Sequence, residues 1–362
     1  MENFIVSARK YRPLEFDTVV GQSHITDTLE HAIENNQLAQ ALLFCGPRGV
    51  GKTTCARILA RKINEKAGAS DDTGFAFNIY ELDAASNNSV DDIRDLIDQV
   101  RFAPQVGKYK VYIIDEVHML STAAFNAFLK TLEEPPAHAI FILATTEKHK
   151  IIPTILSRCQ IYDFKRIQIE DIQQYLRKIA DQEHIQYEDD ALFLIAQKAD
   201  GALRDALSIF DRLTTFTQRN ISLTKAAEIL NILDYDYYLR MADLAQNNDI
   251  PQILKQFNEI VSKGFDAHIF IGGLGSHFRD LMMAQNLKTL DLIEMGEKTK
   301  EKYVEQSRNW TAQQLIDALE ICNQADINYK NSKNQRLTVE IALMQLASLS
   351  SGDVAKKKKI ES

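Results

Sequence analysis

The stretch GPRGVGKT, residues 46–53, lies between a short apolar run and a segment with helical character. It fits the pattern G-x-x-x-x-G-K-[ST], and it follows ALLFC (41–45) and precedes TCARILARKI (54–63). A phosphate-binding loop needs this context, because the strand before it and the helix after it direct the loop's backbone N–H groups at one point. The stretch therefore predicts a nucleotide-binding α/β domain.

The residues of this loop have separate roles in holding a nucleotide. Its glycines let backbone N–H groups close around phosphate oxygens, and the helix N-terminus that follows adds a favourable partial charge. Lys52 is expected to reach the β and γ phosphates, and Thr53 to ligate Mg²⁺. The residues predicted to bind ATP here are Gly46, Pro47, Arg48, Gly49, Val50, Gly51, Lys52, Thr53 and Thr54.

A second apolar run, KVYIIDEVH (110–118), ends in two carboxylates. Asp115 is placed to hold Mg²⁺ and Glu116 to polarise the attacking water. Alone, two acids after a strand are ordinary loop chemistry, but beside the phosphate loop they predict the second half of an ATP site. A third run, ILATTE (142–147), ends in Thr145 and Thr146. Strand-end capping is the simple interpretation, and a hydroxyl near the γ-phosphate is the one that the other motifs favour.

Short apolar runs alternate with amphipathic segments over about the first 165 residues. Besides 41–45, the predicted strands are 77–82, 110–114 and 139–144. Residues 89–102 predict a helix, with Asn88 or Ser89 as its cap. This alternation predicts a mostly parallel sheet covered by helices on both faces.

After residue 167 the pattern becomes helical. Residues 170–230 read as three short helices, broken by HIQYEDD and KADGA. Further helices are predicted at 236–246, 250–262, 266–284, 311–328 and 335–349. The expected domains are 1–167, 168–230 and 231–350, followed by a flexible basic tail at 351–362.

Composition excludes several classes of protein. The 362 residues carry 42 basic and 50 acidic side chains, a net charge of −8, which argues against a protein that coats DNA. No apolar run reaches 18 residues, so no membrane span is expected. The basic residues follow the N-terminal apolar patch, unlike a secretory signal, so a cytoplasmic location is expected. The four cysteines are scattered and predict neither disulfides nor a zinc site.

With these motifs in order, the chain resembles the AAA+ ATPases, and among them the gamma/tau subunits of the bacterial DNA polymerase III clamp loader. The matching stretches are ARKYRPLEFDTVVGQ (8–22), GPRGVGKTTCAR (46–57), ELDAASNNSVDDIR (81–94), YIIDEVHMLS (112–121), FNAFLKTLEEPP (125–136), ILSRCQ (155–160) and GALRDALS (201–208). The resemblance implies an α/β P-loop domain with a parallel sheet, a small all-α lid domain and an all-α collar domain.

The resemblance also assigns roles. It implies an adenine pocket lined by Tyr11, Arg12, Pro13, Val19 and Val20. It implies that Thr145 or Thr146 is the first sensor of the γ-phosphate, and that Arg204 is the second, acting from the lid on its own chain. A helix-surface ion pair of Arg204 with Asp205 or Asp211 is the simpler alternative.

Arg158 has two competing interpretations. The residues before it are apolar and no carboxylate follows until Asp163. A structural account makes it a surface ion-pair partner. The resemblance makes it an arginine inserted into the site of the neighbouring subunit. Such an arginine stabilises the charge on the leaving γ-phosphoryl group.

Two departures from the family are visible. Many gamma/tau subunits carry a zinc module between the halves of the nucleotide site, whereas residues 64–78 here contain no cysteine or histidine, so no zinc is predicted. The chain also ends soon after the expected third domain. It is either a short gamma-like form or a piece of a longer subunit.

The resemblance implies a pentamer with delta, delta-prime and further copies of this chain, which uses ATP and Mg²⁺ to open a sliding clamp and load it on primer–template DNA. No membrane partner is expected. DNA contacts are expected at the N-terminus of the 89–102 helix and at Arg94, Arg101, Lys108 and Lys110, for which a solvated charged face is equally consistent. Two apolar sets, Ile316, Leu319 and Ile321 and also Leu343, Leu346 and Leu349, fit a subunit interface or an intradomain core.

Two other functions remain open from sequence. Another AAA+ DNA motor, such as a branch-migration helicase, normally carries a dedicated DNA-binding domain, and none is evident here. A catalytically idle scaffold like the delta-prime subunit would lack a working phosphate loop. The stretch at 46–53 and the acids Asp115 and Glu116 argue against that scaffold.

Overall fold

The structure is a computed structural model that describes residues 5–66, 78–230, 235–286, 288–293 and 295–349. The chain divides into two compact units. The first consists of residues 1–184 and 195–216, and the second of residues 185–194 and 217–362. The predicted tail at 351–362 lies outside the described residues.

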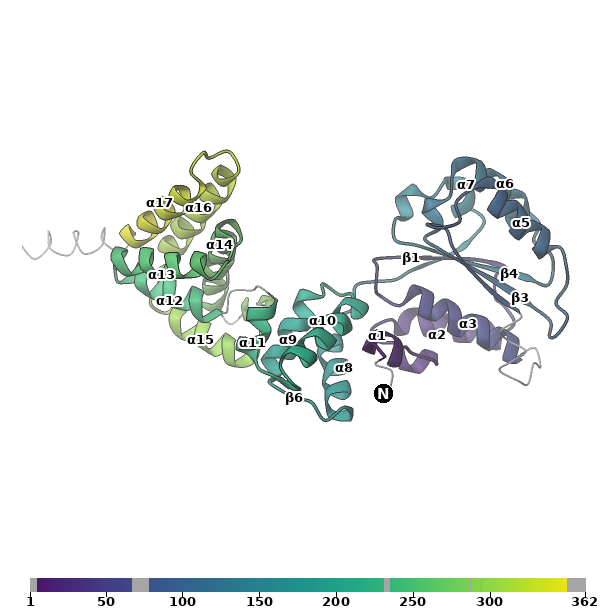
Figure 1. Cartoon of the computed structure of the whole chain (residues 1–362), viewed down its shortest axis with the longest axis horizontal. Helices are drawn as coiled ribbons and strands as arrows, with labels where there is room; N and C mark the ends of the chain where they lie inside the picture. The colour runs from purple at the N-terminus through teal and green to yellow at the C-terminus, as the bar shows by residue number, and fades with distance from the viewer. Residues whose placement is uncertain (1–4, 67–77, 231–234, 287, 294, 350–362) are drawn as a thin grey trace, which may run out of the picture. The chain divides into compact units, whose positions relative to one another are not determined.

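A five-stranded parallel sheet forms the centre of the first unit (Figure 1). Its strands are β1 (Ala41–Cys45), β2 (Ile79–Asp83), β3 (Lys110–Asp115), β4 (Ala139–Thr145) and β5 (Gln160–Asp163), in the order β2-β3-β4-β1-β5. All four pairings are parallel. The predicted parallel sheet is confirmed, although β5 was not predicted.

Alternate residues of β1 face opposite sides of the sheet, which builds two cores. Leu42 and Phe44 pack with α2 (Ser23–Glu34) and α3 (Lys52–Lys66). Leu43 and Cys45 pack with α5 (Val90–Val100), α6 (Thr122–Glu133) and α7 (Pro153–Leu156), on the other side of the sheet in Figure 1. Because all five residues of β1 are buried, the loop that follows the strand starts from a fixed point.

The cap of α5 settles a choice that the sequence left open. Ser89 is the N-cap residue: its hydroxyl accepts from the backbone N–H of Asp92, and the Asp92 carboxylate accepts from the backbone N–H of Ser89. This reciprocal capping box satisfies two backbone donors that the first turn of a helix leaves open.

The N-terminal segment is bound to two helices that follow the sheet. It contains α1 (Ser7–Lys10) and the 3-10 turn η1 (Phe16–Thr18), and the helices are α8 (Ile169–Gln182) and α10 (Leu203–Phe216). The backbone N–H of Ser7 donates to Asp211 on α10 at 2.7 Å, and the Tyr175 hydroxyl on α8 donates to the Tyr11 carbonyl at 2.8 Å. Residues more than 160 positions apart therefore share one wall of this unit.

The helix count predicted for 170–230 was wrong. Four helices occupy this stretch, because α9 (Asp189–Lys198) and α11 (Leu223–Ile229) accompany α8 and α10. In the second unit, two short parallel strands, β6 (Gln186–Tyr187) and β7 (Asn220–Ile221), also form a pair that the all-helical prediction missed. Each has two residues, too few to give a period-2 pattern.

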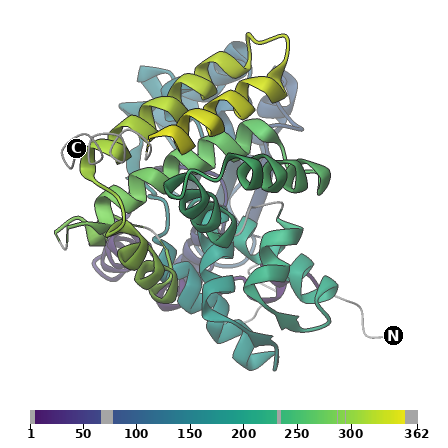
Figure 2. The same ribbon diagram turned by 90° about the vertical axis from the view of Figure 1, so that its left-hand side faces the viewer.

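The rest of the second unit is helical. The helices α12 (Tyr235–Gln246), α13 (Ile250–Ser262), α14 (Ala267–Ala284), α16 (Ala312–Tyr329) and α17 (Gln335–Ser348) match the five predicted segments within one residue. Figure 2 shows α16 and α17 side by side at the C-terminal end of the colour scale. The helix α15 (Glu297–Ser307) was not predicted, since its sequence EKTKEKYVEQS is almost entirely polar.

The structure decides in part whether the two predicted apolar sets belong to a subunit interface or to a core. Leu343 and Leu346 are buried in the core of the second unit, and Leu319, Ile321 and Leu349 pack against that core. Ile316 is 45% exposed. Most of these side chains therefore hold this unit together. None of the helices within the described ranges combines the length and the apolar character that a bilayer span requires.

His277 is buried in this core with both ring nitrogens hydrogen-bonded. Its Nδ1 lies 2.7 Å from the Tyr303 hydroxyl and its Nε2 lies 3.1 Å from Gln306 Oε1. The Gln306 amide nitrogen donates to the Leu239 carbonyl, which leaves Oε1 as an acceptor for Nε2–H. The ring is therefore neutral, and burial lowers the pKa of His277 from its ordinary value of 6.5 to about 3.

We expect acidification to destabilise the second unit through His277. The pKa of His277 in the folded state lies below its value in the unfolded state. Between these two values the unfolded chain binds more protons, so the free energy of unfolding falls as the pH falls. Between about pH 7.5 and pH 5.5 the loss from this one residue is about 1.4 kcal/mol. Trp310, the single tryptophan, is buried in the same core, so its fluorescence reports denaturant unfolding of this unit. His277→Gln should remove this part of the pH dependence, and an equal dependence in both proteins would contradict the assignment.

Candidate functional site

The loop between β1 and α3 approaches the chain beyond β5 closely. Gly46 has φ +145°, and a Cβ on it would lie 2.4 Å from the Phe164 carbonyl oxygen. Gly49 has φ +78°, and a Cβ there would lie 3.1 Å from the Cβ of Ala202, just before α10. Only glycine meets both constraints without displacing backbone. The loop is thereby closed against β5 on one side and α10 on the other.

Lys52 is buried and turned back on this loop. Its Nζ donates to the carbonyl oxygens of Gly46 at 2.7 Å and Pro47 at 2.8 Å. Burial lowers the pKa of Lys52, which the nearby carboxylates of Glu116 and Asp115 partly counteract. Among the described residues no carboxylate lies within ion-pair distance of Nζ. A buried cation held by carbonyls alone is well placed to accept an anionic partner.

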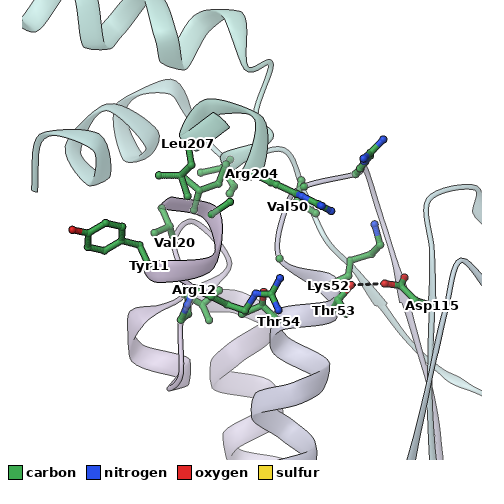
Figure 3. Close-up of a pocket in the computed structure, with 18 of the residues that line it drawn as sticks. Tyr11, Arg12, Val20, Val50, Lys52, Thr53, Thr54, Asp115, Arg204 and Leu207 are labelled. Carbon is green, nitrogen blue, oxygen red and sulfur yellow. Dashed lines mark hydrogen bonds between the residues drawn. The ribbon is translucent and has the colours of Figure 1, made fainter. Parts of the chain in front are cut away.

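Thr53 and Asp115 meet across the first turn of α3 and the end of β3. The Thr53 hydroxyl donates to Asp115 Oδ2 at 2.7 Å, the contact drawn as a dashed line in Figure 3. A hydroxyl and a carboxylate are hard oxygen donors of the kind that Mg²⁺ takes, together with waters and phosphate oxygens. These two residues therefore fit the predicted magnesium site.

Glu116 has an unusual backbone conformation and a fixed side chain. Its φ of 48° lies in the left-handed region, which is uncommon for a residue with a Cβ. Its Oε2 accepts from the Thr146 backbone N–H at 3.2 Å and from the Thr146 hydroxyl at 2.9 Å. Thr145, in contrast, is buried, and its hydroxyl accepts from the Glu147 backbone N–H at 3.0 Å. Of the two threonines, Thr146 is the one that contacts Glu116.

A single pocket collects most of the predicted residues (Figure 3). In that view Lys52, Thr53 and Asp115 lie on one side, and Tyr11, Val20 and Leu207 on the other. The predicted residues that line it are Tyr11, Arg12, Pro13, Val19, Val20, Arg48, Gly49, Val50, Gly51, Lys52, Thr53, Thr54, Asp115, Glu116 and Arg204. Five predicted residues do not line it: Gly46, Pro47, Thr145, Thr146 and Arg158.

Four apolar residues complete the pocket wall without having been predicted. They are Ala8, Ile167, Leu203 and Leu207. The buried amide of Gln22 was also missed: its Nε2 donates to the Lys165 carbonyl at 2.7 Å, and its Oε1 accepts from the Lys165 backbone N–H. Nothing in the local sequence distinguishes these residues from ordinary core positions.

Arg204 reaches the pocket from the first turn of α10. Its backbone N–H donates to the Gly49 carbonyl at 3.3 Å, which joins α10 to the phosphate loop. The ion pairs considered from sequence are absent among the described residues, because Asp211 accepts from Ser7 instead and no contact to Asp205 forms. The surface ion-pair alternative for Arg204 was wrong, and its guanidinium is available to the pocket.

Arg158 has partners that the sequence did not indicate. Its guanidinium forms an ion pair with Glu133, at the end of α6, and donates to the Thr154 carbonyl at 2.6 Å. The carboxylate lies 25 positions earlier in the chain, so this pair agrees with the interpretation of Arg158 as a surface ion-pair partner, although the partner is distant in sequence. The side chain keeps 31% of its surface exposed and does not line the pocket of its own chain.

Three family models match successive parts of the chain. Residues 21–168 match the model for the DNA polymerase III delta subunit. Residues 171–218 match the ATPase lid domain of DNA polymerase III clamp loader subunits, and residues 221–360 match domain III of the DNA polymerase III subunits gamma and tau. The DNA polymerase III subunit gamma of Buchnera aphidicola subsp. Baizongia pistaciae is 34% identical over 372 residues, which cover 96% of this chain and 98% of that protein.

The chain belongs to the gamma and tau subunit family of DNA polymerase III.

Longer members of the gamma and tau family are also similar to the chain. The DNA polymerase III subunit tau of Bacillus subtilis (strain 168) is 40% identical over 354 residues, covering 94% of this chain. The chain spans 63% of the length of that relative. A RuvB mutant from Thermotoga maritima has a TM-score of 0.50 at 21% identity, covering 65% of this chain and 79% of RuvB. At that identity the likeness concerns the fold alone, and it agrees with the predicted P-loop AAA+ domain.

The basic residues that the family resemblance made candidates for DNA contact differ in exposure. Arg94 and Arg101 are exposed and each pairs with an aspartate three positions earlier, at 3.2 Å. Lys110 is buried, with its Nζ near the Gln99 carbonyl and over the Tyr80 ring. Lys110 therefore does not belong to a solvated face, and its inclusion among the contacts was wrong.

The interval in which many gamma and tau subunits carry zinc lies largely outside the described residues, which omit 67–77. Within the described ranges no group of three or more His, Cys, Asp or Glu side chains is placed to hold a metal ion. The absence of zinc therefore stays a prediction from sequence.

Proposed function

We propose that the first unit binds and hydrolyses ATP, and that the chain is the ATPase subunit of the DNA polymerase III clamp loader. The observation that carries the proposal is the meeting of Lys52, Thr53, Asp115, Glu116 and Arg204 around one pocket. These are the cationic, hydroxyl and carboxylate groups that phosphoryl transfer to water requires. Membership of the gamma and tau family is the reason for proposing the clamp loader as the assembly in which this ATPase acts.

ATP binding replaces contacts that the loop now makes with itself. Lys52 leaves the carbonyls of Gly46 and Pro47 for the β and γ phosphates, which gives a buried cation an anionic partner. The adenine lies against the wall formed by Tyr11 to Pro13 and by Val19 and Val20. Thr53 and Asp115 would hold Mg²⁺, which would supply positive charge to neutralise the phosphates.

Glu116 is the group that orients the attacking water. At present its Oε2 is held by Thr146, so Thr146 is the residue we assign as the first sensor. Thr146 can exchange its bond to Glu116 for one to the γ-phosphate, and this exchange links the presence of the third phosphate to the freedom of the carboxylate. Arg204, on α10, is assigned to the same phosphate from the lid side.

Arg158 completes the site of a neighbouring subunit. It does not line its own pocket and is partly exposed, so we infer that it reaches the γ-phosphate held by the next chain of a ring. Each ATP site then needs Arg158 of a neighbouring subunit, so ATP hydrolysis depends on assembly of the ring. The partners proposed are delta, delta-prime and further copies of this chain in a pentamer, with a sliding clamp and primer–template DNA. We also propose a cytoplasmic location, because the DNA that this complex would replicate lies there.

The test is ATP hydrolysis by the chain assembled with delta and delta-prime, with and without the sliding clamp and primed DNA. Strong stimulation that requires both clamp and DNA is expected, and Lys52→Ala should abolish it. Activity that ignores the clamp, or ATP-driven unwinding of duplex DNA, would replace the clamp loader with another AAA+ DNA motor. No nucleotide binding at all would make the chain a scaffold.

A further inference from the structure

His118 lies between two carboxylates at the end of the sheet. Its imidazole is buried, with 6% of its surface exposed. Nδ1 lies 3.3 Å from Glu116 Oε2 and 3.0 Å from the Thr145 hydroxyl, and Nε2 lies 3.0 Å from Glu147 Oε2. The ring thus contacts the carboxylate that is proposed to orient the attacking water, and also Thr145, the last residue of β4, and Glu147 just beyond it.

The neighbours of His118 determine where its proton lies. The Thr145 hydroxyl accepts from the Glu147 backbone N–H at 3.0 Å, which leaves its own hydrogen to donate to Nδ1. The hydrogen bond from Lys150 lowers the pKa of Glu147, so this carboxylate is ionised and accepts from Nε2–H. A ring protonated on Nε2 donates to Glu147 and accepts from Thr145. The orientation of the ring is therefore fixed at both ends. Its Nδ1 then brings no proton to Glu116 Oε2, so the imidazole meets that oxygen as a fixed wall that keeps the carboxylate away from the ring.

The fixed ring limits where the Glu116 carboxylate can go. Thr146 holds Oε2 by two hydrogen bonds, at 3.2 and 2.9 Å. The imidazole lies against the same oxygen from the direction of η2 (Val117–Met119). When Thr146 turns to a phosphate, the imidazole is the contact that remains. A carboxylate with three rotatable bonds would otherwise sample several rotamers.

We propose that His118 is a positioning residue that holds the Glu116 carboxylate toward the attacking water. This proposal rests on the proposed function, in which Glu116 orients that water. His118 does not line the pocket, so it acts through Glu116 rather than on the nucleotide. A histidine that only filled space in the core would influence stability and leave the turnover of bound ATP unchanged.

Three substitutions separate these possibilities. Asparagine places its amide near the position of Nδ1, whereas glutamine reaches the position of Nε2, and leucine supplies neither group. In the assembled loader, His118→Leu is expected to lower kcat by about 10- to 100-fold, with the Kd for ATP unchanged. His118→Asn should recover most of this loss and His118→Gln should not. Wild-type kcat in His118→Leu, or recovery by Gln and not by Asn, would overturn the proposal.

A double substitution tests whether His118 acts through Glu116. In a Glu116→Gln background, His118→Leu should cause no further loss of kcat, because the group that it positions is already removed. A further loss of the same size as in the wild type would overturn the proposal. Hydrolysis at the wild-type rate by Glu116→Gln alone would instead refute the proposed function. The comparison of Asn with Gln remains informative if the leucine variant fails to fold, since these two side chains have the same chemistry.

Discussion

Arg158→Ala is expected to retain ATP binding and to lose ATP hydrolysis by about 10³- to 10⁵-fold in the assembled loader, the range for arginines supplied by a neighbouring subunit. The side chain does not contact its own pocket, so the Kd for ATP of the single chain should not change. The measurement is steady-state hydrolysis with clamp and primed DNA, beside nucleotide binding by the isolated chain.

The ion pair with Glu133 provides the matched control. If Arg158 mattered only through this pair, Glu133→Gln would reproduce the loss. We expect Glu133→Gln to hydrolyse ATP normally, because the exposed pair contributes only about 0–1 kcal/mol to stability. Mixed with Lys52→Ala chains, Arg158→Ala chains should regain turnover wherever an intact loop meets an intact arginine. No recovery in verified mixed rings would count against action between subunits.

Glu116→Gln is expected to lower kcat by about 10²- to 10⁴-fold while ATP still binds. The amide oxygen can still accept from Thr146, but an amide does not polarise water as a carboxylate does. The result should be a chain that holds ATP without turnover, seen as retained nucleotide after gel filtration and a reduced single-turnover rate.

Glu147→Gln is the control for Glu116→Gln. Glu147 is a neighbouring carboxylate that contacts His118 and does not line the pocket, and glutamine keeps an acceptor there. Its kcat should stay close to that of the wild type. Equal losses in the two variants would mean that general charge at the end of the sheet, rather than Glu116, supports the reaction.

The predictable parts of the fold are those in which buried positions form an apolar pattern that is visible in the local sequence. β1 and β4 are buried over their full length and read directly as apolar runs. β5 is an edge strand in which only Tyr162 is buried, so its sequence gives no apolar run. Helix α15 was missed for a similar reason, because a polar helix has no periodic apolar stripe.

The candidate site likewise contains residues that the sequence predicts and contacts that it does not. Residues in a fixed motif, such as Lys52, Thr53 and Asp115, follow from spacing, since one strand–loop–helix unit places them. Contacts between distant segments do not: the pair of Arg158 with Glu133, the bond from Gln22 to Lys165 and the place of His118 depend on how strands pack. The proposed choice of Thr146 over Thr145 as the first sensor likewise rests on the position of Glu116.

The hydrogen bonds of the N-terminal segment have a consequence for nucleotide exchange. Ser7 is bonded to Asp211 on α10, and Tyr11 is bonded to Tyr175 on α8. The wall that is proposed to bind the base and the helix that carries Arg204 are thus connected. If α10 moves away from Gly49, the wall is expected to move with it. The contacts to the base and to the phosphates of a bound nucleotide would then be lost together. If the proposed function holds, ADP release is expected to depend on one opening motion, which would set its rate.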